Sequence, residues 1–154
     1  MAGCAGLLEH PAMYRKILVA LDTTPSDHEL LPAITQLAIL LKSELLLLHV
    51  ADGWAARNFD QLNLAESEEM KEDSRYLEEI AARVRAETGL EISVRLAMGN
   101  PPDQILKVAD REKCDLIALA SHGHRLIGDI IHGSTIEAVR HHARIPILAV
   151  PPKK

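Results

Sequence analysis

The sequence has few cysteines and few aromatic residues, and each shortage excludes a class of protein. Only two of the 154 residues are cysteines, Cys4 and Cys114, and no CxxC motif is present. This argues against a disulfide-stabilised scaffold and favours a reducing compartment, so we expect a cytoplasmic protein. Aromatic residues make up 3% of the chain, which is too little for a platform on which bases stack.

A basic excess and a long apolar run are also missing. The formal net charge is -5, whereas nucleic-acid-binding domains carry a basic footprint. The longest apolar run, which ends at Val50, falls well short of the roughly 18 residues that a membrane helix needs. We therefore expect no nucleic-acid partner and no membrane insertion. The length fits one domain that buries its core without disulfides or metal.

Residues 1–12 differ from the rest of the chain. They are mostly small or apolar apart from Glu9 and His10, and they lack the basic start of a signal peptide. We interpret them as a flexible N-terminal arm, which leaves residues 13–154 as the folded domain.

From Tyr14 onward, short apolar runs alternate with amphipathic stretches. Between the runs, apolar residues recur at helical spacing, for example at Leu30, Ile34, Leu37 and Leu41. Alternation of five strands with four helices predicts an α/β domain with a parallel sheet and helices on both faces. The five expected strands cover residues 17–21, 45–50, 92–98, 116–120 and 145–150.

Helix starts are marked by capping residues. The segment 24–27 (Thr-Pro-Ser-Asp) offers an N-cap, a proline at the first helical position and an acid at the third. Residues 100–103 (Asn-Pro-Pro-Asp) repeat that arrangement, and residues 134–137 (Ser-Thr-Ile-Glu) form a capping box.

The patterns of the strands suggest their order. The third strand alternates apolar and polar residues, as an edge strand with one wet face does, whereas the first, second and fourth are apolar on both faces. We therefore predict an open doubly wound sheet of order 3-2-1-4-5. Ligands of such sheets bind at the carboxyl ends of the strands that flank the switch point. Here those positions are Asp22 and Thr23, Val50, and the segment 121–134.

The segment after the fourth strand carries a candidate phosphate cradle. Gly123 is followed after nine residues by Gly133, Ser134 and Thr135, which lead into the last helix. Glycine lets backbone amides approach a phosphate, and a helix start adds partial positive charge. The alternative is structural, with Gly123 in a turn and Ser134 as an N-cap. Asp22 likewise fits either a helix-start acid or an acceptor for ribose hydroxyls.

The chain from Tyr14 to Pro151 resembles the universal stress protein family, in its nucleotide-binding branch. The matching segments are 16–22 (KILVALD), 47–50 (LLHV), 99–101 (GNP), 114–117 (CDLI), and 121–123 (SHG) with 133–134 (GS). The branch that binds ATP carries G-x2-G-x9-G-[S/T] after the fourth strand. Gly123, Gly133 and Ser134 keep this pattern, and Ala120 replaces its first glycine.

The resemblance implies ATP as the ligand, with Mg2+ as a candidate companion. It implies that Asp22 contacts the ribose, that Val50 offers backbone groups to the adenine, and that the glycine loop cradles the phosphates. Arg125 is the obvious cation of that loop, and Asp129 adds a negative charge to it. The complete expected nucleotide site is Ala20, Leu21, Asp22, Val50, Ala120, Ser121, His122, Gly123, Arg125, Gly133, Ser134 and Thr135.

Histidines are numerous, yet their spacing does not predict a metal site. His141 and His142 are adjacent on the last helix and diverge by about 100°, and no acid or cysteine completes a familiar ligand spacing. The remaining histidines of the last third of the chain, which lie in the loop, are His122, His124 and His132.

No set of residues commits the chain to catalysis. Ser121 and His122 are neighbours, but the glycine-flanked elbow of a nucleophilic serine is absent. We therefore expect a nucleotide-dependent regulator of a stress response whose protein partner the sequence does not define. The alternative is an enzyme that hydrolyses ATP slowly or transfers a phosphate, with His122 or Asp129 positioning a water. A third is a module with an empty cleft that works through dimer contacts alone.

The last strand predicts a homodimer. Residues 145–150 are apolar on both faces, although the predicted order puts them at the sheet edge, where monomers usually carry charge or a bulge. The resemblance also implies dimerisation through this strand. A two-fold axis would place Leu148 near its symmetry mate. The alternative is that the last helix and the N-terminal arm cover this edge.

Overall fold

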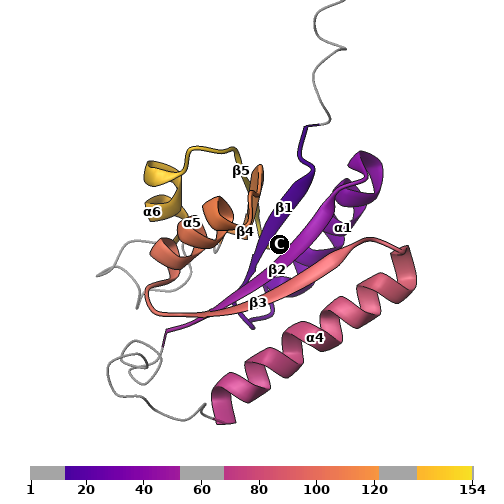
Figure 1. Cartoon of the computed structure of the whole chain (residues 1–154), viewed down its shortest axis with the longest axis horizontal. Coiled ribbons are helices and arrows are strands. Elements are labelled where there is room, and N and C mark those ends of the chain that lie inside the picture. The colour runs from indigo at the N-terminus through magenta and orange to yellow at the C-terminus, as the bar shows by residue number, and fades with distance from the viewer. Residues whose placement is uncertain (1–12, 53–67, 122–134, 154) are drawn as a thin grey trace, which may run out of the picture.

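Strands and helices alternate along the chain in the computed structural model, which describes residues 13–52, 68–121 and 135–153 (Figure 1). The expected N-terminal arm, residues 1–12, lies outside the described residues. None of the helices in these three stretches is long and apolar enough to cross a membrane. The elements are β1 (Lys16–Leu21), α1 (Asp27–Leu41), β2 (Glu44–Ala51), α4 (Glu68–Thr88), β3 (Ile92–Met98), α5 (Pro101–Arg111), β4 (Leu116–Ala120), α6 (Thr135–His142) and β5 (Ile147–Val150).

The strands form one parallel sheet of order β3-β2-β1-β4-β5, which confirms the predicted topology. β1 lies at the centre and pairs with both β2 and β4. β3 is an edge strand whose residues alternate in exposure, as its sequence pattern predicted. Successive strands are added on one side of β1 as far as β3 and on its other side from β4 onward. The switch point therefore lies between β1 and β4.

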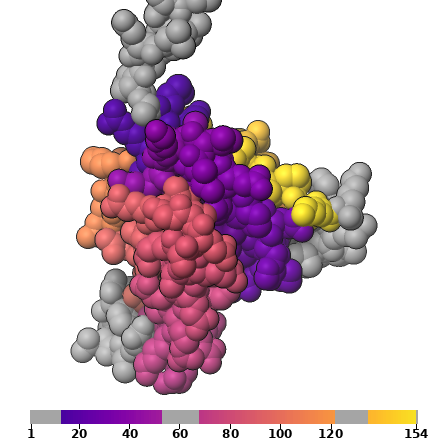
Figure 2. Space-filling model, turned by 90° about the vertical axis from the view of Figure 1, so that its right-hand side faces the viewer, coloured from indigo at the N-terminus to yellow at the C-terminus, as the bar shows by residue number. Residues whose placement is uncertain are grey.

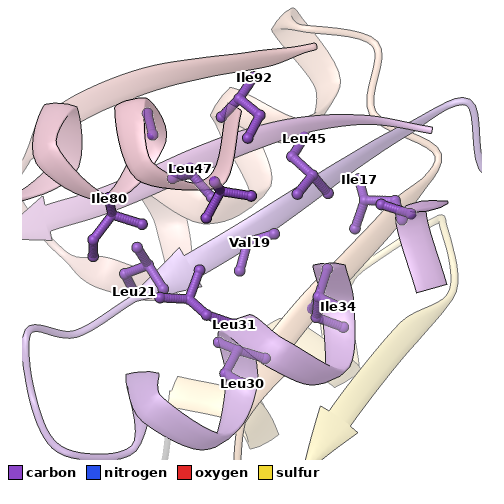
Figure 3. Close-up of a cluster of buried hydrophobic side chains, with 14 of the residues drawn as sticks. Ile17, Val19, Leu21, Leu30, Leu31, Ile34, Leu45, Leu47, Ile80 and Ile92 are labelled. Carbon is purple, nitrogen blue, oxygen red and sulfur yellow. The ribbon is translucent and has the colours of Figure 1, made fainter. Parts of the chain in front are cut away.

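Helices cover both faces of the sheet, with α1 and α4 on one side and α5 and α6 on the other (Figure 1). Successive side chains of a strand point to opposite faces. Ile17, Val19 and Leu21 accordingly join the cluster under α1 and α4, which Figure 3 shows, and Leu18 joins the cluster under α5 and α6. Because both faces are occupied, the ends of the strands are the part of the sheet that a ligand can reach.

One predicted helix start is confirmed and another is wrong. Asn100 caps α5, and its Oδ1 accepts a hydrogen bond from the amide of Asp103 at 3.3 Å. In contrast, α1 begins at Asp27, later than predicted, and Ser26 is its N-cap residue without a side-chain capping bond. The cause is that Thr24 and Asp27 are engaged in the preceding turn, where each makes hydrogen bonds with Asp22. Ser134 of the predicted capping box lies outside the described residues.

β5 is also shorter than predicted, since it begins at Ile147 and not at residue 145. Pro146 has no N–H to donate to a ladder. Its carbonyl nevertheless accepts a hydrogen bond from the amide of Ile117 at 3.0 Å. The proline therefore leads the chain into the sheet without being part of the strand.

Replacing Leu47 by Ala should test the central packing. Leu47 is fully buried between its strand neighbours Val19 and Val94. We expect the free energy of unfolding to fall by about 2–5 kcal/mol, as large-to-small core substitutions do. Urea denaturation measures this change. Leu40→Ala, at a side chain that is 79% exposed, is the matched control and should change stability by less than about 0.5 kcal/mol. Equal losses in both variants would contradict the assignment of the core.

Candidate functional site

The carboxyl ends of β1, β2 and β4 meet at the switch point. Leu21 pairs with His49 on β2, and Ala20 pairs with Leu119 on β4. Asp22, Val50 and Ala120 follow these residues directly, so all three lie at one edge of the sheet. This is the edge at which doubly wound sheets bind ligands.

The predicted site residues within the described chain surround this edge, with different degrees of access. Leu21 is 3% exposed and belongs to the first core cluster, so its backbone is the part that faces the edge. Ala120 packs against the same cluster. Half-buried positions are Ala20, Asp22, Val50, Ala120, Ser121 and Thr135. The residues His122, Gly123, His124, Arg125, Asp129, His132, Gly133 and Ser134 lie outside the described part of the chain.

The remaining described positions are set by backbone structure. The amide of Ser121 donates to the carbonyl of Val150 at 2.8 Å, which ties the end of β4 to the end of β5. Thr135 is the first residue of α6. The free amides of a helix start, together with the helix dipole, favour an anionic group.

The turn after β1 is organised around two carboxylates. Oδ1 of Asp22 accepts from the amide of Thr24 at 3.0 Å and from the hydroxyl of the same residue. The carboxylate of Asp27 turns back from the start of α1, where Oδ1 accepts from the amide of Asp22 at 3.2 Å and Oδ2 from the amide of Thr23 at 3.0 Å. Thr23 has a φ of 61°, which is unusual for a β-branched residue. Asp27 therefore holds a strained turn that carries Asp22.

Asp27 has a role that its position in the sequence does not indicate. We expected an acid in the first turn of the helix, and the structure shows that its side chain is buried, with 1% of it exposed. Burial raises the pKa of this carboxyl, while the hydrogen bonds from the Asp22 amide and the Tyr76 hydroxyl lower it in part. A carboxylate is rarely buried unless it has partners, and here the partners include a residue of α4.

Tyr76 supplies that partner from α4. Its hydroxyl donates to Oδ2 of Asp27 at 2.9 Å, across a sequence separation of 49 residues. Burial and the hydrogen bond to Asp27 raise the pKa of Tyr76 far above its usual value, so the phenol remains a protonated donor. Tyr76 was absent from the predicted site. Its rarity was the available signal, since the chain has two tyrosines.

His49 links the same end of β1 to α4 by a second route. Its Nδ1 lies 2.9 Å from the carbonyl oxygen of Leu21, and its Nε2 lies 3.3 Å from Oδ2 of Asp73. A carbonyl can only accept, so Nδ1 carries the hydrogen. His49 stood within a motif of the resemblance but received no role. A lone ionisable residue near the end of a buried apolar run was the signal for it.

The described residues contain no group of three His, Cys, Asp or Glu side chains that could hold a metal ion. His142 Nδ1 contacts the carbonyl of Ala138 within its own helix, and His141 faces Glu137. Cys114 is buried, which raises the pKa of its thiol to about 11. The thiol is therefore neutral and a poor nucleophile at neutral pH. At the switch point, the described residues offer the carboxylate of Asp22 and backbone groups for binding.

Comparison with known proteins gives relatives that share the fold of this chain. The universal stress protein MJ0577 of Methanocaldococcus jannaschii is 26% identical over 154 residues, which covers 90% of this chain and 95% of that protein. A solved universal stress protein in complex with cAMP superposes with a TM-score of 0.67 at 20% identity, covering 92% of this chain and 99% of that one.

A universal stress protein from Archaeoglobus fulgidus in complex with dAMP has a TM-score of 0.64 at 19% identity, and the match covers 90% of this chain and 98% of that one. These solved structures share the fold of this chain. The model of the universal stress protein family matches residues 13–151, which includes every strand and helix described above. The chain therefore belongs to the universal stress protein family.

Proposed function

We propose that the chain binds an adenine nucleotide, ATP foremost, at the carboxyl ends of β1, β2 and β4, and acts as a nucleotide-dependent regulator in a stress response. The observation that carries this proposal is the turn after β1. Asp22 stands at the switch point, half-buried, on a backbone that Asp27 holds in place. Two solved relatives were determined with cAMP and with dAMP, which supports an adenine nucleotide as the ligand class.

Each side of the proposed site has a distinct task. The carboxylate of Asp22 accepts hydrogen bonds from ribose hydroxyls, and the backbone of Val50 and of Leu21 borders the base. The phosphates lie toward Ser121 and the start of α6 at Thr135, where helix amides favour negative charge. His122, Gly123, Arg125, Gly133 and Ser134 complete the phosphate side in this proposal, and Mg2+ accompanies the phosphates.

A thermal shift with Mg-ATP tests the proposal. A ligand at a hundred times its Kd stabilises the folded state by about 2.7 kcal/mol, so the Tm should rise with ATP concentration. Asp22→Ala should weaken ATP binding by roughly tenfold or more, because hydrogen bonds to a charged acceptor contribute about 1.5–3 kcal/mol. Each variant is compared with its own ligand-free Tm.

The matched control is Asp110→Ala, which removes an exposed acid near the end of α5. This residue lies close to the amino ends of β1 and β4, at the edge of the sheet opposite the proposed site. This variant should keep the full ATP-dependent shift. Absence of any shift in the wild-type protein would overturn the proposed ligand. A full shift in Asp22→Ala would overturn the assignment of the site.

We further propose that the protein is a homodimer through β5. This strand is at the edge of the sheet, and Leu148 on it is 37% exposed. Exposed apolar edge strands invite pairing with another chain.

Leu148→Lys tests this interface. Two-fold antiparallel pairing brings each Leu148 near its mate, so the variant would place two like charges together. The dimer Kd should rise by at least about tenfold, which corresponds to 1.4 kcal/mol. Light scattering at micromolar concentration measures the mass. Leu40→Lys, at an exposed leucine of α1, should leave the dimer intact. A wild-type mass of one chain would refute the dimer, and dissociation by Leu40→Lys alone would move the interface to α1.

A further inference from the structure

A single buried carboxylate connects α4 to the turn that carries Asp22. Oδ2 of Asp27 accepts two hydrogen bonds, one from the hydroxyl of Tyr76 at 2.9 Å and one from the amide of Thr23 at 3.0 Å. Its Oδ1 accepts from the amide of Asp22. α1 and α4 lie side by side on this face of the molecule (Figure 2). The hydroxyl of Tyr76 thus acts on the same oxygen atom that orients the backbone of the turn.

Tyr76 determines how firmly that oxygen can hold the turn. Each hydrogen bond that a carboxylate accepts in a site without water stabilises its charged form, and removing a donor destabilises that form. Two donors on one oxygen also fix the rotation of the carboxylate plane, and thereby the direction from which the Thr23 amide binds. Without the phenol, the carboxylate would be held by the two backbone amides alone and would take up a proton more readily. A protonated oxygen would offer an O–H where the amide needs an acceptor.

The turn has a particular need for this restraint. Thr23 has a left-handed backbone with a φ of 61°. A non-glycine residue in such a conformation is strained, and it persists only when the surrounding contacts hold it there. Here the hydrogen bonds from the amides of Asp22 and Thr23 to Asp27 hold the turn in this conformation. Asp22 is therefore positioned by contacts that extend to α4.

We propose that Tyr76 is a positioning residue for Asp22, and that through Asp27 it sets the preference of the site for nucleotides with ribose hydroxyls. This inference rests on the proposed nucleotide function. The discriminating ligand is 2′,3′-dideoxy-ATP, which keeps the base and the triphosphate of ATP but lacks both hydroxyls that Asp22 would bind. A residue that acts through Asp22 should affect ATP and leave this analogue alone.

The chain contains a matched control for the loss of a phenol. Its second tyrosine, Tyr14, precedes β1 and packs against the first core cluster at the opposite end of that strand. Tyr14→Phe removes a hydroxyl of the same kind, far from Asp22. Tyr76→Phe keeps the aromatic ring on α4 and removes the donor to Asp27.

Isothermal titration with ATP and with 2′,3′-dideoxy-ATP tests the proposal in the wild-type protein and in these variants. We expect the wild type to bind ATP about tenfold more tightly than the analogue. Tyr76→Phe should weaken ATP binding by about three- to tenfold and change the affinity for the analogue by less than about twofold. Tyr14→Phe should match the wild type with both ligands. In an Asp22→Ala background, Tyr76→Phe should have no further effect on ATP.

Other outcomes distinguish a failure of this inference from a failure of the proposed function. If Tyr76→Phe keeps the full preference for ATP, or weakens both ligands equally, Tyr76 has no positioning role or a merely structural one, and the inference is wrong. If the wild type fails to bind ATP, the proposed function is wrong and the inference falls with it. If the wild type binds ATP but does not distinguish the analogue, the role of Asp22 is wrong. Should Tyr76→Phe not fold, Asp27→Asn interrupts the same link, and an unchanged preference in that variant refutes the inference.

Discussion

The arrangement of the carboxyl edge of the sheet depends on the burial of one charge. Asp27 is almost inaccessible to solvent, and this burial raises the pKa of its carboxyl group. Its hydrogen bonds to two backbone amides and one phenol offset part of the cost. Because the buried carboxylate needs all of these donors, the backbone turn and the phenol are held close to it. The end of β1, the start of α1 and the middle of α4 are consequently held as one unit.

The layered core explains why this unit lies where it does. β1 and β2 are buried on both faces, because their successive side chains pack in turn against the helices on one face and on the other. Polar groups can therefore enter these strands only near their ends, where the sheet stops. His49 lies near the end of β2 and Asp22 directly after β1, in keeping with this restriction. The topology then brings the ends of three strands together at the switch point.

The sequence was sufficient to predict the five strands and their order, apart from the start of β5. Periodicity reports which face of an element is buried, and the pattern of the third strand, with alternating Ile92, Val94 and Leu96, was enough to place it at an edge. Local rules failed where a long-range contact competed with them. Asp27 fits the rule for an acid at a helix start, but its carboxylate serves the preceding turn and Tyr76 instead.

The contacts of α4 could not have been predicted in this way. Tyr76 and Asp73 look like ordinary polar positions of a helix whose apolar face is formed by Leu77, Ile80 and Val84. Nothing local distinguishes a polar residue that faces solvent from one that meets a buried acceptor from a distant turn. Their contacts with Asp27 and His49 exist only once α4 is packed in the folded chain.

The two kinds of contact on α4 have different physical roles. Its apolar side chains supply most of the stabilisation through burial, but burial is non-directional and specifies a position along the helix axis poorly. Hydrogen bonds are directional, and each has a narrow range of distance and angle. Asp73 and Tyr76 are separated by three positions, so they lie on one side of the helix, one facing His49 and the other Asp27. A shift of α4 along its axis would break both contacts, so that Asp27 would lose its phenol donor and His49 its carboxylate partner. The same two contacts that fix α4 therefore also fix the ends of β1 and β2, so the position of this helix and the shape of the candidate site are determined together.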